Sequence, residues 1–190
     1  MVLEFVIAAM TALQPGVDHT VLANAISSRV AAELPLFRND VDRRRTAALL
    51  VAIAFRESSL RLDAVGDKGQ SLCAFQIGRT SGGTTAMLTD ANLCVGAAFA
   101  ILRTSIRLCP AFPVAWYAAG GDAAKACASV PAQRISRDRM ALAARLVRDV
   151  AAAEVVKPAT TGFLTPIDAA FGRWDLERRD LHGLRSGRLS

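Results

Sequence analysis

The residue of this chain best suited to acid–base chemistry is Glu57, which follows a long apolar segment. Read as a helix, residues 47–59 place Leu50, Ile53 and Glu57 on one stripe, the stripe that faces a core. Burial and the negative end of a helix both disfavour an ionised carboxylate. This position therefore favours a glutamic acid that stays protonated near neutral pH, as a general acid must.

Glu57 also has a purely structural interpretation. Glutamates near helix ends are commonly solvated or paired with an arginine, and Arg56 and Arg61 lie close in the sequence. The segments that follow Glu57 favour the catalytic interpretation.

Four short motifs occur in order in the middle of the chain. They are Glu57-Ser58, LCAFQI at 72–77 after a glycine-containing turn, DANLCVGAAFAIL at 90–102, and WYAAG at 116–120. Together they resemble the lytic transglycosylase domain of the goose-lysozyme-like superfamily, over about residues 40–150. Cys73 stands where that family often has Gly, Phe75 where it often has Met, and Ala118 in place of the motif Asn.

The resemblance implies a mainly α, lysozyme-like (goose-type or transglycosylase) helical domain, with a small loop or β-hairpin region beside an active-site cleft. It implies cleavage of the β-1,4 bond between N-acetylmuramic acid and N-acetylglucosamine in peptidoglycan, with Glu57 as the catalytic residue. Glu57 would protonate the glycosidic oxygen, then take the proton of the muramoyl C6 hydroxyl as a 1,6-anhydro ring closes. No water attacks, so a second carboxylate is not required, unlike in two-carboxylate glycosidases.

Five further residues are expected to bind substrate: Ser58, Gln76, Tyr117, Phe75 and Trp116. Ser58 would contact substrate or instead cap the helix end. The Gln76 amide would meet a sugar N-acetyl group or the acid. Tyr117 would place its hydroxyl near the acid or be an ordinary buried tyrosine. The rings of Phe75 and Trp116 would form apolar walls of the site or belong to the core.

Two other functions stay open. A hydrolytic lysozyme would use Asp63 or Asp67 to activate water. A non-catalytic, lysozyme-like structural protein of a virion or secretion complex is favoured by Ala118 and by the basic tail. The intact Glu57, Gln76 and Tyr117 oppose it.

The elements that must position these residues are nearly all helical. We expect helices from Asp18 or Thr20 to Leu34, from Asp40 to Glu57, over 80–88, from Asp90 to Leu108, around Trp116, and over 137–155 with Ser136 as its cap. Residues 60–78 are expected to form a loop with short extended pieces. Residues 1–156 would form the domain, and residues 157–190 a basic tail that docks to a protein partner in a virion or secretion complex.

Composition narrows the partners. Of 190 residues, 52% are hydrophobic and only 6% aromatic, which suits packed helices. The net charge of +6 suits binding to an anionic bacterial wall. The basic residues are scattered along the sequence and form no nucleic-acid recognition motif, so nucleic acid is not expected as a partner. We expect no cofactor, no metal site and no membrane span.

The first ten residues lack a basic start and include Glu4, so they do not have the pattern of a signal peptide. The protein would act at the cell wall or in the periplasm, carried by a phage particle or a specialised export route.

The four cysteines, Cys73, Cys94, Cys109 and Cys127, are candidates for two disulfides in an oxidising compartment. Cys94 and Cys109 would sit about 22 Å apart at opposite ends of one helix, so they cannot pair. Cys73–Cys94 with Cys109–Cys127 is preferred for its shorter loops. Cys73–Cys109 with Cys94–Cys127, and four buried free thiols, stay open.

Overall fold

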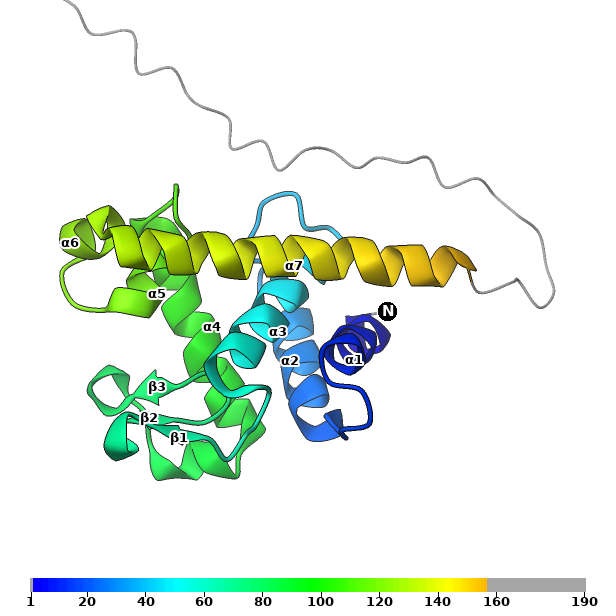
Figure 1. Ribbon diagram of the computed structural model, residues 1–190, viewed down its shortest axis with the longest axis horizontal. Coiled ribbons are helices and arrows are strands. Elements are labelled where there is room, and N and C mark those ends of the chain that lie inside the picture. Colours follow the sequence, from blue (N-terminus) through cyan, green and yellow to red (C-terminus); the bar gives the residue numbers. More distant parts are fainter. Residues whose placement is uncertain (1, 157–190) are drawn as a thin grey trace, which may run out of the picture. The chain divides into compact units, whose positions relative to one another are not determined.

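Helices dominate the part of the chain that the structure, a computed structural model, describes, residues 2–156 (Figure 1). The helices are α1 (Val2–Leu13), α2 (Thr20–Ala32), α3 (Arg44–Ser58), α4 (Ala91–Leu108), α5 (Ala115–Ala119), α6 (Ala123–Ala128) and α7 (Val130–Val156). The prediction of a mainly α protein is confirmed. The proposed docking tail, residues 157–190, lies outside the described residues.

The core is built around α3. Every residue from 46 to 54 is buried, and α3 packs against α1, α2 and α7. Figure 1 shows α7 lying across α3. Leu50 and Ile53 are fully buried, as the stripe that ends in Glu57 predicts. Alanines at 47, 48, 52 and 54 leave room for the neighbouring helices to approach closely.

One predicted helix cap, Asp90, is confirmed, whereas the N-cap of α3 is Arg43 and Asp40 reaches the first turn of that helix from outside it. The Asp40 carboxylate is buried and accepts the backbone N–H groups of Arg45 (3.0 Å) and Thr46 (2.7 Å), although α3 itself begins at Arg44. Asp90 accepts the N–H groups of Asn92 (2.8 Å) and Leu93 (3.1 Å) at the start of α4. Carboxylates at these positions satisfy N–H groups that have no partner within the helix.

Two other predictions are wrong. The last helix begins at Val130, not after Ser136, and Ser136 is buried within it. Its hydroxyl accepts the backbone N–H of Val114 (3.0 Å), which connects α7 to the start of α5. Residues 80–88 form no single helix but two short 3₁₀ segments, η2 (Arg79–Ser81) and η3 (Thr85–Leu88).

The segment between α3 and α4 carries a small antiparallel sheet in the order β1-β2-β3. Its strands are β1 (Val65–Gly66), β2 (Ser71–Leu72) and β3 (Ile77–Gly78), with the 3₁₀ turn η1 (Asp67–Gly69) between the first two. Leu72 is the residue opposite both Val65 and Ile77. The extended pieces predicted in residues 60–78 are therefore present.

All four cysteines are paired. Cys73 is bonded to Cys94, with Cα atoms 6.2 Å apart, and Cys109 to Cys127, with Cα atoms 5.3 Å apart. This is the pairing with the shorter loops. The first bridge connects the loop after β2 to the first turns of α4, and the second connects the end of α4 to α6.

By length and composition α4 could cross a bilayer, the one helix among residues 2–156 that could. In this structure it serves as a core helix: Cys94, Val95, Ala98, Phe99 and Leu102 are buried, and it packs against α2 and α5. Core helices of soluble proteins meet the same criterion.

A chain ended at Val156 is expected to stay folded. The buried apolar residues of the described part lie between Phe5 and Val150, so the truncation removes none of them. Circular dichroism of the shortened chain should show the helices of the described domain, and its thermal unfolding midpoint should lie within a few degrees of the full chain's. Unfolding of the shortened chain would show that the boundary near Val156 is wrong. If the shortened chain stays folded and still binds any protein partner that the full chain binds, residues 157–190 have no docking role.

Candidate active site

Glu57 lies in the last turn of α3, with its side chain 24% exposed. The helix stops there because Ser59 (φ 55°) and Leu60 (φ 62°) both adopt the left-handed conformation. The Leu60 N–H donates to the Ala54 carbonyl (3.2 Å), a bond typical of a Schellman helix end, and the Leu60 side chain is buried. The chain turns away sharply, and the carboxyl is left at the margin of the core.

The carboxyl of Glu57 is paired with Arg139 of α7. Arg139 Nη2 lies 3.1 Å from Oε1 of Glu57, and the arginine side chain is only 15% exposed. Arg139 Nη1 also contacts Asp138 (2.8 Å), whose other oxygen binds Arg56 (2.8 Å). Four side chains of alternating charge thus run from α3 to α7 and back. The partner of Glu57 is therefore neither Arg56 nor Arg61.

Arg139 is not among the residues predicted from the sequence, although the pattern that indicates Glu57 also indicates this arginine. Arg139, Leu142 and Leu146 have the spacing i, i+3 and i+7, and both leucines are buried. A charge on the apolar stripe of a helix requires a partner. The apolar stripe of α3 thus carries one negative charge and that of α7 one positive charge. This pattern could have indicated from the sequence that α3 and α7 meet at this pair.

Tyr117 of α5 completes the group around Glu57. Its hydroxyl donates to the backbone carbonyl of Phe75, in the loop between β2 and β3. Burial raises the pKa of the Tyr117 phenol well above its usual value, and the negative charge of Glu57 raises it further, whereas Arg139 opposes the shift. Side chains of α3, α5 and α7 thus act on one another electrostatically.

Ser58 connects the end of α3 to the same loop. Its hydroxyl lies 3.0 Å from the Ala54 carbonyl and 2.9 Å from the Ala74 carbonyl. One hydroxyl hydrogen can serve only one of these acceptors at a time. When Ser58 donates to Ala74, the adjacent carbonyls of Ala74 and Phe75 receive the hydroxyls of Ser58 and Tyr117. Phe75 itself is fully buried in the main core.

Gln76 and Trp116 are engaged elsewhere. The Gln76 amide donates to the Cys73 carbonyl (3.1 Å), and its side chain covers Gly66, where a Cβ would lie 2.0 Å from the amide oxygen. The Trp116 indole N–H donates to the Gly121 carbonyl (3.0 Å). Its ring packs in a second small core around the Cys109–Cys127 bridge. The structure shows no contact of either residue with Glu57, and their substrate-binding roles stay predictions.

Asp63 and Asp67, which the hydrolytic alternative would use, have no contact with Glu57 among the described residues. Asp67 accepts a hydrogen bond from the Ser71 hydroxyl within the small sheet. Asp63 lines a surface hollow together with residues of the α1–α2 connection, among them His19, and Glu57 does not line that hollow. In residues 2–156 no three His, Cys, Asp or Glu side chains are grouped as metal ligands would be.

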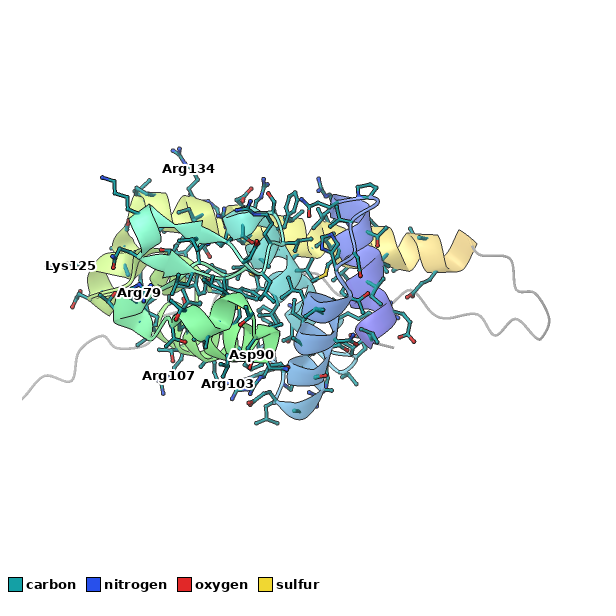
Figure 2. All side chains as sticks on the ribbon, turned by 90° about the horizontal axis from the view of Figure 1, so that it is seen from below. Arg79, Asp90, Arg103, Arg107, Lys125 and Arg134 are labelled. Atoms are coloured by element: carbon teal, nitrogen blue, oxygen red, sulfur yellow. A yellow bond between two sulfur atoms is a disulfide. The ribbon has the colours of Figure 1, made fainter. Side chains whose placement is uncertain are left out.

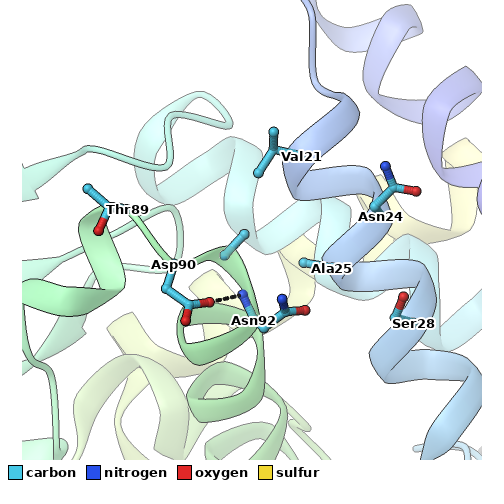
Figure 3. A pocket seen from close by; sticks show the side chains of 8 residues that line it. Val21, Asn24, Ala25, Ser28, Thr89, Asp90 and Asn92 are labelled. Carbon is cyan, nitrogen blue, oxygen red and sulfur yellow. Dashed lines mark hydrogen bonds between the residues drawn. The ribbon is translucent and has the colours of Figure 1, made fainter.

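A second hollow lies between α2 and the start of α4 (Figure 3). Asn24 and Ser28 of α2 face Thr89, Asp90 and Asn92 across it. The Asp90 carboxylate is already used in the helix cap. The site around Glu57 contributes no residue to this hollow.

The exposed basic side chains labelled in Figure 2 lie at several edges of the described domain. In this view Arg134 lies at one edge, Arg103 and Arg107 at the opposite one, and Lys125 and Arg79 toward a third. Arg103 is in addition paired with Glu33 (3.1 Å).

Tyr117 is the only tyrosine of the chain, so its ionisation can be followed alone in the near-ultraviolet. We expect the native protein to form tyrosinate well above pH 10, and the denatured protein near pH 10. Because the folded state has the higher pKa, its stability is retained below about pH 10 and falls as pH rises beyond it. A native titration at the ordinary position would contradict the buried placement of the hydroxyl.

Chemically, a largely buried carboxyl that interacts with a desolvated phenol and one arginine can give and accept a proton, or it can serve as a structural ion pair. No protein-family model, curated protein or solved structure matches this chain. The choice between these uses therefore depends on the site geometry and on the four motifs.

Proposed function

We propose that this protein is a lytic transglycosylase that cuts the MurNAc-β-1,4-GlcNAc bond of peptidoglycan, with Glu57 as acid and base. The observation that carries the proposal is the convergence of the four motifs. Glu57 and Tyr117, sixty positions apart, interact electrostatically, and Tyr117 binds the second motif at Phe75. The Cys73–Cys94 bridge connects the second motif to the third. Motifs spread over residues 57–120 are thus connected to one another near one carboxyl, and this supports the proposal.

The departure at Cys73 is consistent with this proposal. Cys73 adopts φ 64°, in the left-handed region that glycine enters without steric cost. The family often has Gly at the matching position. The disulfide to Cys94 holds the backbone in a conformation that this side chain disfavours, so Cys and Gly meet the same backbone requirement by different means.

In the proposed reaction Glu57 donates its proton to the glycosidic oxygen as the bond to the muramoyl C1 breaks. The C6 hydroxyl oxygen then bonds to C1, and its proton passes to the Glu57 carboxylate. One carboxyl is thus restored at the end of each turnover, and water is neither consumed nor released. The lysozyme-like fold, the action at the bacterial wall and the carrier, a phage particle or secretion machine, belong to the same proposal.

One observation favours the non-catalytic alternative. Glu57 already has a counter-charge in Arg139, and a charged pair at the margin of a core is also a common structural feature. The hydrolytic alternative is less favoured, because Asp67 is bonded to Ser71 and Asp63 lines a hollow that Glu57 does not reach.

Mass analysis of the fragments released from purified peptidoglycan separates the three functions. A lytic transglycosylase releases 1,6-anhydromuramoyl ends, which are lighter by one water than the reducing ends left by a hydrolase. A non-catalytic protein releases neither. Reducing ends from the wild-type protein would replace the proposal by a lysozyme, and an absence of products that persists across walls of different peptide composition would favour the structural role.

A further inference from the structure

The contacts of the Glu57 carboxyl are unequal. Oε1 receives Arg139 Nη2, whereas no residue between 2 and 156 donates a hydrogen bond to Oε2. By contrast, both oxygens of Asp138 are engaged, one by Arg56 and one by Arg139. The exchange of protons in the proposed reaction needs one free carboxyl oxygen, and the structure leaves one.

Arg139 is itself held in place. Its second nitrogen, Nη1, is bonded to Asp138 (2.8 Å), which Arg56 binds from the α3 side. The planar guanidinium therefore has two fixed contacts, and such a group loses less freedom per hydrogen bond than a lysine would. The Nε of Arg139 is buried and has no hydrogen-bond partner among the described residues. The guanidinium is therefore held where it contacts the two carboxylates, even though this position leaves one of its own N–H groups unpaired.

From these contacts we infer that Arg139 is the positioning residue of the acid–base site. It fixes Oε1 of Glu57, so that Oε2 is the oxygen that gives and takes the proton. It also supplies a counter-charge for the carboxylate that exists between the two proton transfers. The inference rests on the proposed function, because it assigns Arg139 a part in that reaction.

The test compares kcat and KM for solubilised glycan strands across four proteins: wild type, Arg139→Met, Arg139→Lys and Arg145→Met. Arg145 lies on the same helix but is 57% exposed and pairs only distantly with Asp149, so Arg145→Met is the matched control. A misplacement of the reacting group by about 1 Å costs about 100-fold. We expect Arg139→Met to lower kcat by about 10- to 100-fold and to leave KM within about threefold, since Arg139 is not assigned to substrate binding.

Arg139→Lys should recover part of kcat, because it keeps the charge but not the two-point contact. The single tyrosine gives a readout that does not depend on activity. Because Arg139 lowers the pKa of Tyr117, Arg139→Met should move its titration to higher pH, while Glu57→Gln should move it to lower pH. These shifts would show that the variants stay folded around the site.

The outcomes separate the two claims. Wild-type activity that depends on Glu57 but is unaffected in Arg139→Met overturns the inference and leaves the proposed function intact. A drop equal in Arg139→Met and Arg139→Lys that follows their loss of thermal stability also overturns it, since the role would be structural. A wild-type protein without activity, with the Tyr117 shifts present, overturns both and identifies a structural ion pair.

Discussion

Glu57→Gln is expected to remove wall-lytic activity and to keep the fold. A general acid contributes about 10²- to 10⁴-fold to rate, and the same carboxyl serves both proton transfers of the proposed reaction, so the loss should reach at least the upper part of this range. The glutamine amide oxygen can still accept the Arg139 Nη2 hydrogen, which preserves the contact between α3 and α7. Loss of turbidity of purified peptidoglycan measures the activity, and circular dichroism measures the fold.

Glu154→Gln is the matched control. Glu154 lies on α7 and pairs with Arg44 at 2.8 Å, but its side chain is 46% exposed and takes no part in the site. An exposed ion pair contributes little to stability, so this variant should clear peptidoglycan at the wild-type rate. Activity of Glu57→Gln close to that of Glu154→Gln would end the catalytic assignment of Glu57.

Reduction of the two disulfides is expected to have the largest effect on stability. The bridges close separate loops with sequence separations of 21 and 18, and each is worth about 3 kcal/mol by loop-closure entropy. Because the loops do not overlap, the two contributions should add, to about 6 kcal/mol, against a total of about 5–15 kcal/mol for a domain. Thermal scans with and without reductant should differ by roughly 10–25 °C.

Replacing the two cysteines of one disulfide by serine shows how much stability and activity depend on that disulfide. Cys109→Ser with Cys127→Ser should lose stability but keep more of the activity, because neither cysteine takes part in the contacts of Glu57, Ser58 or the Tyr117 hydroxyl. Cys73→Ser with Cys94→Ser should lose both, because it frees the loop whose carbonyls receive Ser58 and Tyr117. A midpoint unchanged by reductant, with four reactive thiols, would show that the bridges do not stabilise the fold.

The features predicted correctly from the sequence are set by neighbours in the chain. Asp90 caps α4 because its carboxylate reaches N–H groups two and three positions ahead. The cysteine pairing followed from helix length, which separates Cys94 from Cys109, and from loop length. The stripe of α3 has the helical period itself, so its buried leucine and isoleucine could be read directly.

The features that were missed depend on contacts between distant residues. Glu57 and Arg139 are 82 positions apart, and nothing local selects Arg139 over Arg56. Ser136 has the residue type of a cap, yet its hydroxyl serves the backbone of Val114 inside the fold. Trp116 adjoins Tyr117 in the sequence, but the two side chains belong to different cores. Local patterns thus drew attention to Glu57, and the folded arrangement of helices shows which residues contact it.

The two cross-links also constrain how this protein could leave a cell. A chain closed into loops at 73–94 and 109–127 cannot pass as a single thread through a pore that admits one extended strand. Any route of that kind requires the thiols to remain reduced until passage is complete, and oxidation then becomes the step that fixes the folded form on the far side. A carrier that moves the folded domain imposes no such order of events.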